Sequence, residues 1–378
     1  MLAASAAPTP LYPEYADRFG LGPATVTAVF AVYAVALLAA LLTLGGLSDH
    51  VGRRPVMLAA LAVETVSLVL FTLADGAVDL LVARIVQGAA TGVFTGVASA
   101  ALVDLEPAGS NLGALVNSAG ALVGLALGAL GCGLLIDVAP APTRLVYAVL
   151  VVAMLALMLL VRRLPETSVR RPGALRSLRP EIGVPPAART QFVVVLPIIM
   201  ATWSMGGLFL SLGPSIGRDV LGLSSSTEQG VLVMIFVGSG AVASVLARPW
   251  PPRRIMLVGA SVLAVGTAVA VVGVAVGSAA VFLPAEAVAG AGFGMGFLGA
   301  FQTLTELSEP ARRAELLAAV FTVNYLSFAI PAVVAGLLVA RFGLGPVAEV
   351  YGLVVVALAV LLVVLETIAG RRRQRGLR

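Results

Sequence analysis

The sequence predicts an all-α membrane protein that crosses the bilayer many times. The chain has 378 residues, of which 60% are hydrophobic and only 11% are charged, and its mean hydropathy is +1.05. Apolar runs recur along almost the whole chain, and most are long enough to cross a hydrocarbon layer of about 30 Å as helices of about 20 residues. Because the bilayer core offers backbone groups no hydrogen-bond partner, every span is expected to be helical.

Eleven full spans are expected in chain order, in two groups separated by an arginine- and proline-bearing stretch. The first group consists of residues 24–44, 55–74, 79–103, 111–136 and 143–161. The second group consists of residues 190–214, 228–247, 254–275, 279–305, 314–340 and 346–369. The predicted domains are an N-terminal transmembrane bundle over 1–161, a cytoplasmic linker over 162–189, a C-terminal transmembrane bundle over 190–369 and a basic cytoplasmic tail over 370–378.

The N-terminal residues 1–12 are apolar but too short to span, because 12 helical residues reach only about 18 Å. The charge distribution described next requires the span 24–44 to run from outside to inside. An earlier segment of the chain must therefore already have crossed the membrane. We therefore expect a truncated first helix, a fragment beside the eleven full spans, as a start codon assigned too late would produce. A re-entrant or peripheral N-terminus is the alternative.

The placement of the charges predicts the orientation. All 24 basic residues are arginine, and most of them lie in alternate loops and in the tail. The opposite loops carry only Arg18, Arg144, Arg218 and Arg341. By the positive-inside rule the arginine-rich loops and the C-terminus are expected to be cytoplasmic. The all-arginine usage and the abundance of Ala, Gly and Val are typical of a high-GC genome, so the expected location is the inner (plasma) membrane of a bacterial cell.

The same observations exclude several classes of function. Membrane topology accounts for the net charge of +5, so no nucleic-acid binding is expected. His50 is the only histidine, no metal-ligating residues cluster, and no nucleophile sits beside a base. The sequence thus predicts neither an enzyme nor a bound metal or cofactor. Cys132, the one cysteine, lies among glycines in an apolar span and is expected to pack rather than to act in redox chemistry.

A glycine-rich, charged segment joins the first two full spans and reads G-G-L-S-D-H-V-G-R-R-P-V-M-L from Gly45 to Leu58. It resembles the signature loop of the major facilitator superfamily of secondary transporters, G-x-L-x-D-x-x-G-R-[RK]. His50 stands where that family usually has Arg or Lys. The resemblance implies two pseudo-symmetric six-helix bundles that rock around a midplane site. The positions that match the pattern are Gly45, Leu47, Asp49, Gly52, Arg53 and Arg54.

The resemblance also implies that this loop is a conformational latch between the halves in the outward-facing state. We expect the glycines to permit close backbone approach and a tight turn, and we expect Arg53 to reach the acid at the cytoplasmic end of another span, Asp104. Anchoring of the arginines at lipid headgroups is the alternative. The second half keeps Arg253 and Glu306 but has prolines in place of the Gly/Asp portion, so one working latch is expected. The predicted latch residues are Gly45, Asp49, Gly52, Arg53, Arg54 and Asp104.

A weak internal repeat supports the two halves. An offset of 202 residues carries Arg84, Gly88 and Gly92 onto Glu286, Gly290 and Gly294. Arg84 and the glycine that follows resemble the family's fourth-helix pattern R-x-x-x-G, which is associated with proton transfer in proton-coupled members. Two parallel repeats of this kind are typical of the fold that the signature loop implies.

Three ionisable residues inside spans are candidates for proton coupling: Arg84, Glu64 and Glu286. An unpaired charge within the membrane costs at least a few kcal/mol, so Arg84 and Glu64 are expected to be partners. The alternative for Arg84 is that its side chain snorkels to the membrane interface. The alternative for Glu286 is a structural role as a hydrogen-bonding group. Polar and amphipathic residues that are candidates to line a central cavity are Tyr33, Gln87, Asn117, Trp203, Gln302, Asn324 and Tyr325.

The function predicted is secondary active transport of a small solute by alternating access, with proton-coupled efflux of a drug or metabolite by antiport as the preferred mode. A glycine stripe in the fifth helix resembles the drug antiporter element G-x-x-x-G-P-x-x-G-G only in part, since Leu125 replaces its proline. Solute–proton symport for uptake is one alternative, and a non-transporting receptor or scaffold of the same fold is another. The expected partners are the solute, protons and the lipid bilayer, and the protein is expected to be a monomer.

Overall fold

The computed structural model describes residues 1–106, 112–168, 171–180, 182–306 and 312–375, and this part of the chain is helical almost throughout, without strands. Eleven of its helices are long and apolar enough to cross a membrane, which confirms the predicted fold class. In the first half they are α3 (Pro23–Leu44), α5 (Arg53–Leu73), α6 (Ala77–Asp104), α7 (Leu112–Val138) and α8 (Pro142–Val161). In the second half they are α9 (Arg189–Ser211), α11 (Ser226–Ala247), α12 (Pro252–Ala275), α13 (Ala279–Glu306), α14 (Arg313–Phe342) and α15 (Leu344–Arg375).

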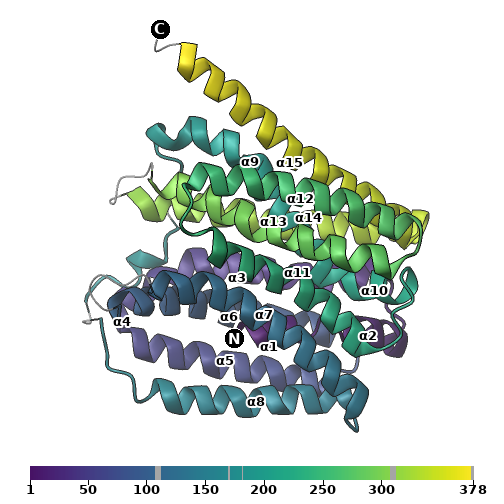
Figure 1. Cartoon of the computed structure of the whole chain (residues 1–378). Helices are drawn as coiled ribbons and strands as arrows, with labels where there is room; N and C mark the ends of the chain where they lie inside the picture. The colour runs from purple at the N-terminus through teal and green to yellow at the C-terminus, as the bar shows by residue number, and fades with distance from the viewer. Residues whose placement is uncertain (107–111, 169–170, 181, 307–311, 376–378) are drawn as a thin grey trace.

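The long helices run back and forth roughly side by side, with the first half below and the second half above in Figure 1. The segment from Gly45 to Arg54 lies at one end of the bundle, which we call the loop end. Here η1 (Gly45–Leu47) and α4 (Ser48–Val51) lead into α5. The short α10 (Gly213–Asp219) follows α9 at the opposite end.

Two boundaries differ from the predicted ones by three residues or more. The last helix, α15, continues to Arg375 instead of ending near residue 369, because arginine and glutamine favour the helical state and the ladder extends once it is formed. The span predicted over 190–214 ends at Ser211 and is followed directly by α10.

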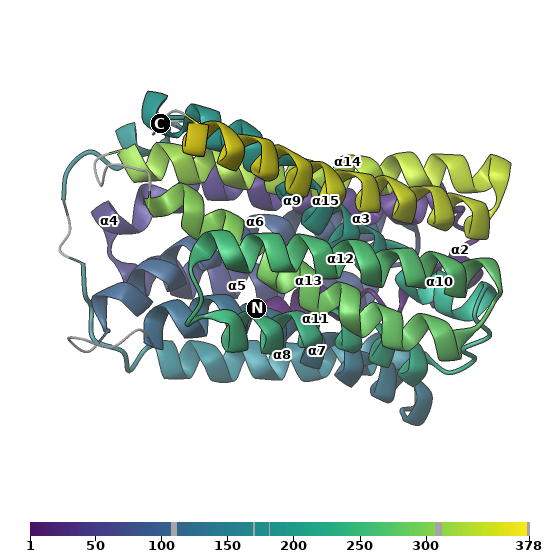
Figure 2. The same cartoon turned by 45° about the horizontal axis from the view of Figure 1, so that its top comes forward.

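The N-terminal segment lies inside the bundle in both views (Figures 1 and 2), and its first helix packs against α6 and α7 of the first half. It is not the single half-helix predicted for residues 1–12. The helix α1 (Leu2–Ala6) breaks off and α2 (Tyr12–Phe19) begins after a turn, because Pro8 and Pro10 have no amide hydrogen for a continuous helix. Residues 4–13 are all buried, so the segment is part of the core rather than peripheral.

The paired glycines of the repeat make equivalent contacts in the two halves. A side chain at Gly88 of α6 would collide with the backbone oxygen of Tyr33 in α3. A side chain at Gly290 of α13 would collide in the same way with the backbone oxygen of Phe236 in α11. Only glycine allows helix backbones to approach this closely, so the repeat marks equivalent helix crossings.

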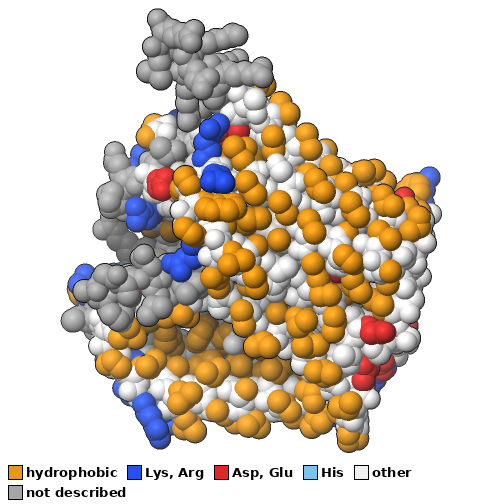
Figure 3. Space-filling model, viewed as in Figure 1, with side chains coloured by type: hydrophobic (Ala, Val, Ile, Leu, Met, Phe, Trp, Pro, Cys, Tyr) orange, Lys and Arg blue, Asp and Glu red, His pale blue; other side chains and the backbone are white. Residues whose placement is uncertain are grey.

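The outer surface carries hydrocarbon side chains over the broad middle of the face in Figure 3, while arginines gather at its loop end. Exposed valines and leucines recur along the spans, for example Val66, Leu246 and Val265. An apolar girdle of this kind is what a helix bundle presents to lipid.

Candidate functional site

A buried polar cluster surrounds Arg84 near the middle of the first half. The side chain of Arg84 is only 1% exposed. Its Nη1 donates to the backbone oxygen of Ser5 at 3.0 Å and to Oε1 of Gln87 at 2.6 Å, and its Nη2 donates to the hydroxyl of Tyr12. Glu64 completes the group, which we call the Arg84 cluster: Ser5, Tyr12, Glu64, Arg84 and Gln87.

Gln87 connects Arg84 to Glu64. Its Nε2 donates to Oε1 of Glu64 at 3.2 Å, while its Oε1 accepts from Arg84. The predicted direct pairing of Arg84 with Glu64 is therefore replaced by a relay, because the amide occupies the space between the two charges. Oε2 of Glu64 has no hydrogen-bond partner among the described residues.

Three aromatic rings enclose the guanidinium of Arg84. Its Cζ lies 5.4 Å from the ring centroid of Tyr12, 5.2 Å from that of Tyr33 and 5.8 Å from that of Phe71. Such cation–π contacts stabilise a charge that has left water. A guanidinium held on all these sides does not reach an interface, so the snorkelling alternative does not fit the structure.

Tyr33 also connects the Arg84 cluster to the second half. It belongs to a small apolar cluster with Ala34, Leu37 and Ala329, against which Tyr325 packs. The helices that carry this contact are α3 of the first half and α14 of the second. A change at Arg84 is thus one side chain away from the contact between the two halves.

An aromatic group gathers around Trp203 in the second half. The Trp203 ring meets Phe297 at 5.5 Å, Tyr325 at 5.0 Å and Phe328 at 5.8 Å between centroids. Buried polar atoms accompany these rings in the same half. Nε1 of Trp203 and both amide atoms of the fully buried Asn324 have no hydrogen-bond partner among the described residues. We call Trp203, Phe297, Tyr325 and Phe328 the Trp203 group, and Asn324 precedes Tyr325 on α14.

Two predicted cavity residues are not placed in either group. Gln302 lies on α13 and is partly exposed, one residue beyond Phe301, which packs on Phe297 at 5.8 Å. Asn117 lies on α7, and its side chain is outside the described residues. The structure thus places Gln87 in the Arg84 cluster with Tyr33 stacked on Arg84, and it places Trp203 against Tyr325, which follows Asn324 along α14.

Glu286 lies on α13 one turn before Gly290, which packs against α11. It is fully buried. Both of its carboxylate oxygens lack a hydrogen-bond partner among the described residues. The structural hydrogen bond considered as an alternative is therefore not made in this arrangement, and an unpartnered buried carboxylate is costly to keep charged.

At the loop end, Arg53 lies at the centre of the predicted latch. Its Nε donates to Oδ2 of Asp104 at 3.1 Å, and its Nη1 donates to the Ser48 hydroxyl at 2.6 Å and pairs with Asp49 one turn earlier. Gly52 has a φ of 113°, a conformation that favours glycine. These contacts of Arg53 lie within the first half.

The expected role of Gly45 in close approach is not seen. A side chain there would meet nothing within 4 Å, and its φ is −57°. On the facing helix α6, a Cβ added at Gly96 would lie 3.5 Å from the Gly45 Cα, which is an ordinary van der Waals distance. The crossing at this point therefore does not require a glycine on either helix.

The linker supplies partners that the sequence prediction missed. The carboxylate of Glu166 accepts from the backbone amides of Arg53 at 2.7 Å and Arg54 at 3.1 Å, so it caps the N-terminus of α5. The hydroxyl of Thr167 donates to Asp104 at 2.9 Å. The Pro-Glu pair at 165 and 166 was the only signal in the sequence, and it named no partner.

The same linker then reaches the second half. Nδ1 of His50 lies 3.1 Å from the backbone oxygen of Pro172, and the amide of Gly183 donates to the backbone oxygen of Glu315 in α14 at 3.3 Å. The linker is therefore tied to the loop at several points and to α14 through Gly183.

The second-half counterpart of the loop uses a different acid. Nε of Arg253 donates to Oε2 of Glu366 at 2.7 Å, and Nε2 of Gln191 donates to the other oxygen at 2.7 Å. Glu306, the equivalent of Asp104, is exposed at the end of α13. The position on α15 is closer to Arg253 in space, although it is more distant in sequence.

Contacts between the halves are concentrated at the end opposite the loop. Asp137 of α7 accepts from the amides of Ser226 at 3.0 Å and Thr227 at 2.8 Å, and so caps α11. Arg218 pairs with Asp17 at 2.9 Å. Hydrogen bonding to Asp219 is the main cause that raises the pKa of Arg218, so this guanidinium stays charged at physiological pH.

The fold agrees with comparisons to known proteins. Residues 1–332 match the family model of the Major Facilitator Superfamily. No curated protein sequence matches the chain.

Solved structures show the same fold. A D-xylose-proton symporter superposes with a TM-score of 0.74 at 18% identity, over 96% of this chain and 94% of that one. The xylose transporter XylE from E. coli superposes in an inward open conformation with a TM-score of 0.74 at 16% identity, over 95% and 91% of the two chains. Its partially occluded inward open conformation gives 0.72 at 14%, over 95% and 93%. The chain therefore belongs to the major facilitator superfamily of membrane transporters.

Proposed function

We propose that this transporter exports a small, largely apolar solute in exchange for protons by alternating access. The observation that carries the proposal is the pair of buried carboxyl groups, Glu64 and Glu286, each with at least one unpartnered oxygen within the described chain. A carboxyl group in apolar surroundings can bind a proton in one state of the cycle and release it in another. One such group lies in each half.

Glu64 is the proposed proton site that a chain of contacts connects to α14 of the second half. Its neighbour Gln87 bonds to Arg84, and Tyr33 stacks on Arg84 while it contacts α14. Protonation of Glu64 would change the charge beside this relay. The relay then carries the change to the helix contact between the halves.

The Trp203 group supports the proposed class of solute. Aromatic faces bind apolar or aromatic molecules, and the few polar atoms at such a site set the orientation. The free amide of Asn324 and Nε1 of Trp203 offer donors and an acceptor. We infer that the solute has an apolar or aromatic body with one or two hydrogen-bonding groups.

The signature loop and linker form the conformational latch in this proposal. Arg53 and Glu166 hold the loop rigid within the first half, and the linker passes from it to α14. The first half would then move as one body, with the linker limiting its separation from the second half at the cytoplasmic end.

Uptake by symport is a second candidate, because a D-xylose-proton symporter has the same fold. Purified protein in oriented proteoliposomes distinguishes the two modes. With an acidic interior, antiport accumulates the solute and raises the internal pH. Symport moves solute and protons outward together.

A panel of aromatic cations, aromatic acids and sugars provides the solutes, and protein-free vesicles are the control. We expect aromatic members to move and the internal pH to rise with them. Thermal stabilisation by a solute without any flux would instead support the receptor alternative. Flux that leaves the internal pH unchanged would contradict proton exchange.

A further inference from the structure

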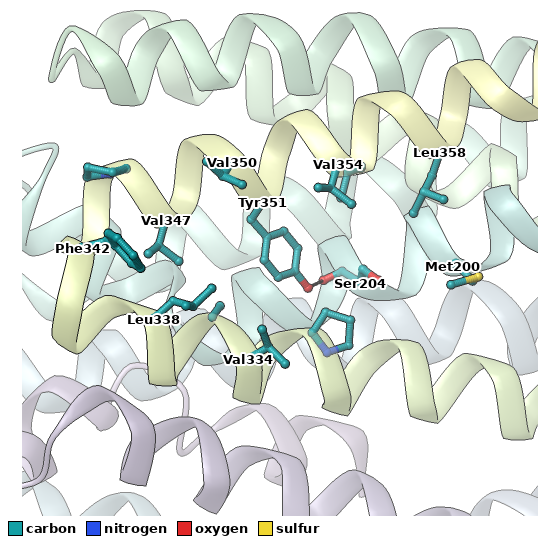
Figure 4. A pocket seen from close by; sticks show the side chains of 14 residues that line it. Met200, Ser204, Val334, Leu338, Phe342, Val347, Val350, Tyr351, Val354 and Leu358 are labelled. Carbon is teal, nitrogen blue, oxygen red and sulfur yellow. Dashed lines mark hydrogen bonds between the residues drawn. The ribbon is translucent and has the colours of Figure 1, made fainter.

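An apolar pocket lies between α9, α14 and α15, outside the two groups described above. Its volume is about 530 Å³. Figure 4 shows α15 along one side and α14 along the other, with Tyr351 reaching between them toward Ser204 of α9. The two helices are joined at Gly343, which has a φ of 83°, so the pocket is a wedge beside the turn.

The polar groups of the pocket are already used by the protein. The hydroxyl of Tyr351 donates to the backbone oxygen of Ser204 at 2.7 Å, and the Ser204 hydroxyl donates to the backbone oxygen of Ser327 at 3.1 Å. The other lining side chains are Met, Pro, Val, Ala, Leu and Phe. No lining residue has a buried polar atom without a partner, so the pocket offers a ligand hydrocarbon contacts only.

The rim faces the outer surface of the bundle. Val334 of α14 is 48% exposed and Val350 of α15 is 61% exposed. The floor is closed, since Ala335 and Val355 are only 2% and 1% exposed. These residues lie within membrane-crossing helices, so the pocket opens to the hydrocarbon of the bilayer rather than to water.

We propose that this pocket binds one acyl chain of a membrane phospholipid. A void of this size would forfeit dispersion contacts along all its walls, and acyl chains are the apolar molecules that surround the opening. The solute of the proposed transport would be better held at the Trp203 group, where unpartnered polar atoms are available. The pocket has none.

The position of the chain would bear on transport, because α14 lies between the pocket and the first half. Val334 and Ala335 line the pocket, and Ala329 on the same helix packs with Tyr33 of α3. An acyl chain between α14 and α15 therefore stabilises the helix that contacts the other half.

Photolabelling with a phospholipid that carries a diazirine near the end of one acyl chain tests the proposal. The wild-type protein in vesicles that contain this lipid is irradiated, digested and mapped by mass spectrometry. We expect adducts on peptides with the pocket floor, at Ala335 and Val355, which lipid beside the protein does not reach. Val334→Phe should lower floor labelling by about threefold or more, because the ring takes up the space of the chain.

The matched control is Val265→Phe, at a valine of α12 that is 62% exposed and does not line the pocket. It should leave floor labelling unchanged. Adducts confined to rim residues, or equal floor labelling in both variants, would overturn the proposal. Absence of floor labelling because a non-lipid molecule occupies the pocket would also overturn the proposal. The measurement requires no transport, so its failure is separate from any failure of proton exchange.

Discussion

The two halves of the molecule place opposite chemistry at equivalent positions. In the first half, Arg84 is buried with partners on nearly every side, from Gln87 to the Tyr12 hydroxyl. At the repeat-related position in the second half, Glu286 is equally buried and has no partner among the described residues. One half holds a charged group in a network, while the other buries a carboxyl group without a described hydrogen-bond partner.

The loop-end arginines differ in the same way. Arg53 is held by Asp104 and its helix is capped by Glu166, so the contacts hold a loop to a linker. Arg253 pairs with the buried Glu366 of α15, so the contacts hold helix to helix. In the first half these contacts hold a loop to the linker, whereas in the second half they hold α12 to α15.

Removal of the charge at Arg84 should have the largest effect. Arg84→Ala leaves Gln87, Tyr12 and the Ser5 carbonyl without their partner, and loss of one member of a buried charged network costs about 3 kcal/mol or more. We expect a clear fall in the melting temperature in detergent and loss of transport. Arg84→Lys keeps the charge but loses the several N–H donors of the guanidinium. Its melting temperature and transport rate should lie between those of the wild type and Arg84→Ala. An unchanged melting temperature for Arg84→Ala would break the contrast between the halves.

Substitution of the two buried carboxyl groups, Glu286 and Glu64, should have the next largest effects, and the two effects should differ. Glu286→Gln should lower substrate-driven proton flux by about tenfold or more, because an amide cannot bind and release a proton. Its melting temperature should not fall, since no partner is lost. Glu64→Gln should flatten the pH profile of transport as well, but it should also disturb the Gln87 relay. A wild-type rate and pH profile in Glu286→Gln would remove this residue from the mechanism.

Substitution of Glu166 and Glu366, the acids at the loop end, should have smaller effects on transport and stability. Glu166→Ala removes the cap of α5, a loss of about 1 kcal/mol, and should slow transport because the latch loosens. Glu366→Ala should lower the melting temperature with less effect on the rate, since Arg253 is half exposed and can turn to water. Transport rates and thermal unfolding curves of both variants show whether each substitution affects the rate or the stability. Equal slowing would mean that both loops act as latches.

The contacts at the opposite end should give the smallest effects. Asp137→Asn weakens the cap of α11, and Asp17→Asn breaks an exposed pair worth about 0–1 kcal/mol. We expect Ala129→Cys, in a Cys132→Ser background, to be labelled faster by a maleimide after Asp137→Asn. Asp17→Asn should change the labelling rate less. Identical rates in all three proteins would show that this end is closed by apolar packing alone.

The sequence alone determined the eleven spans, the division into two halves and the position of the signature loop. These features depend on local hydropathy, on charge placement and on glycine spacing, all of which can be read along the chain. The prediction also named Arg84, Gln87, Glu64 and Tyr33, which the structure brings into contact.

Only the tertiary structure decided the partners. Gln87 stands between Arg84 and Glu64, Glu166 of the linker caps α5, and Glu366 rather than Glu306 meets Arg253. A hydrogen bond requires heavy atoms about 3 Å apart, and in an apolar interior a polar group bonds to whichever group packing brings that close. The polar groups can be named from the sequence, but their pairing depends on how the helices cross.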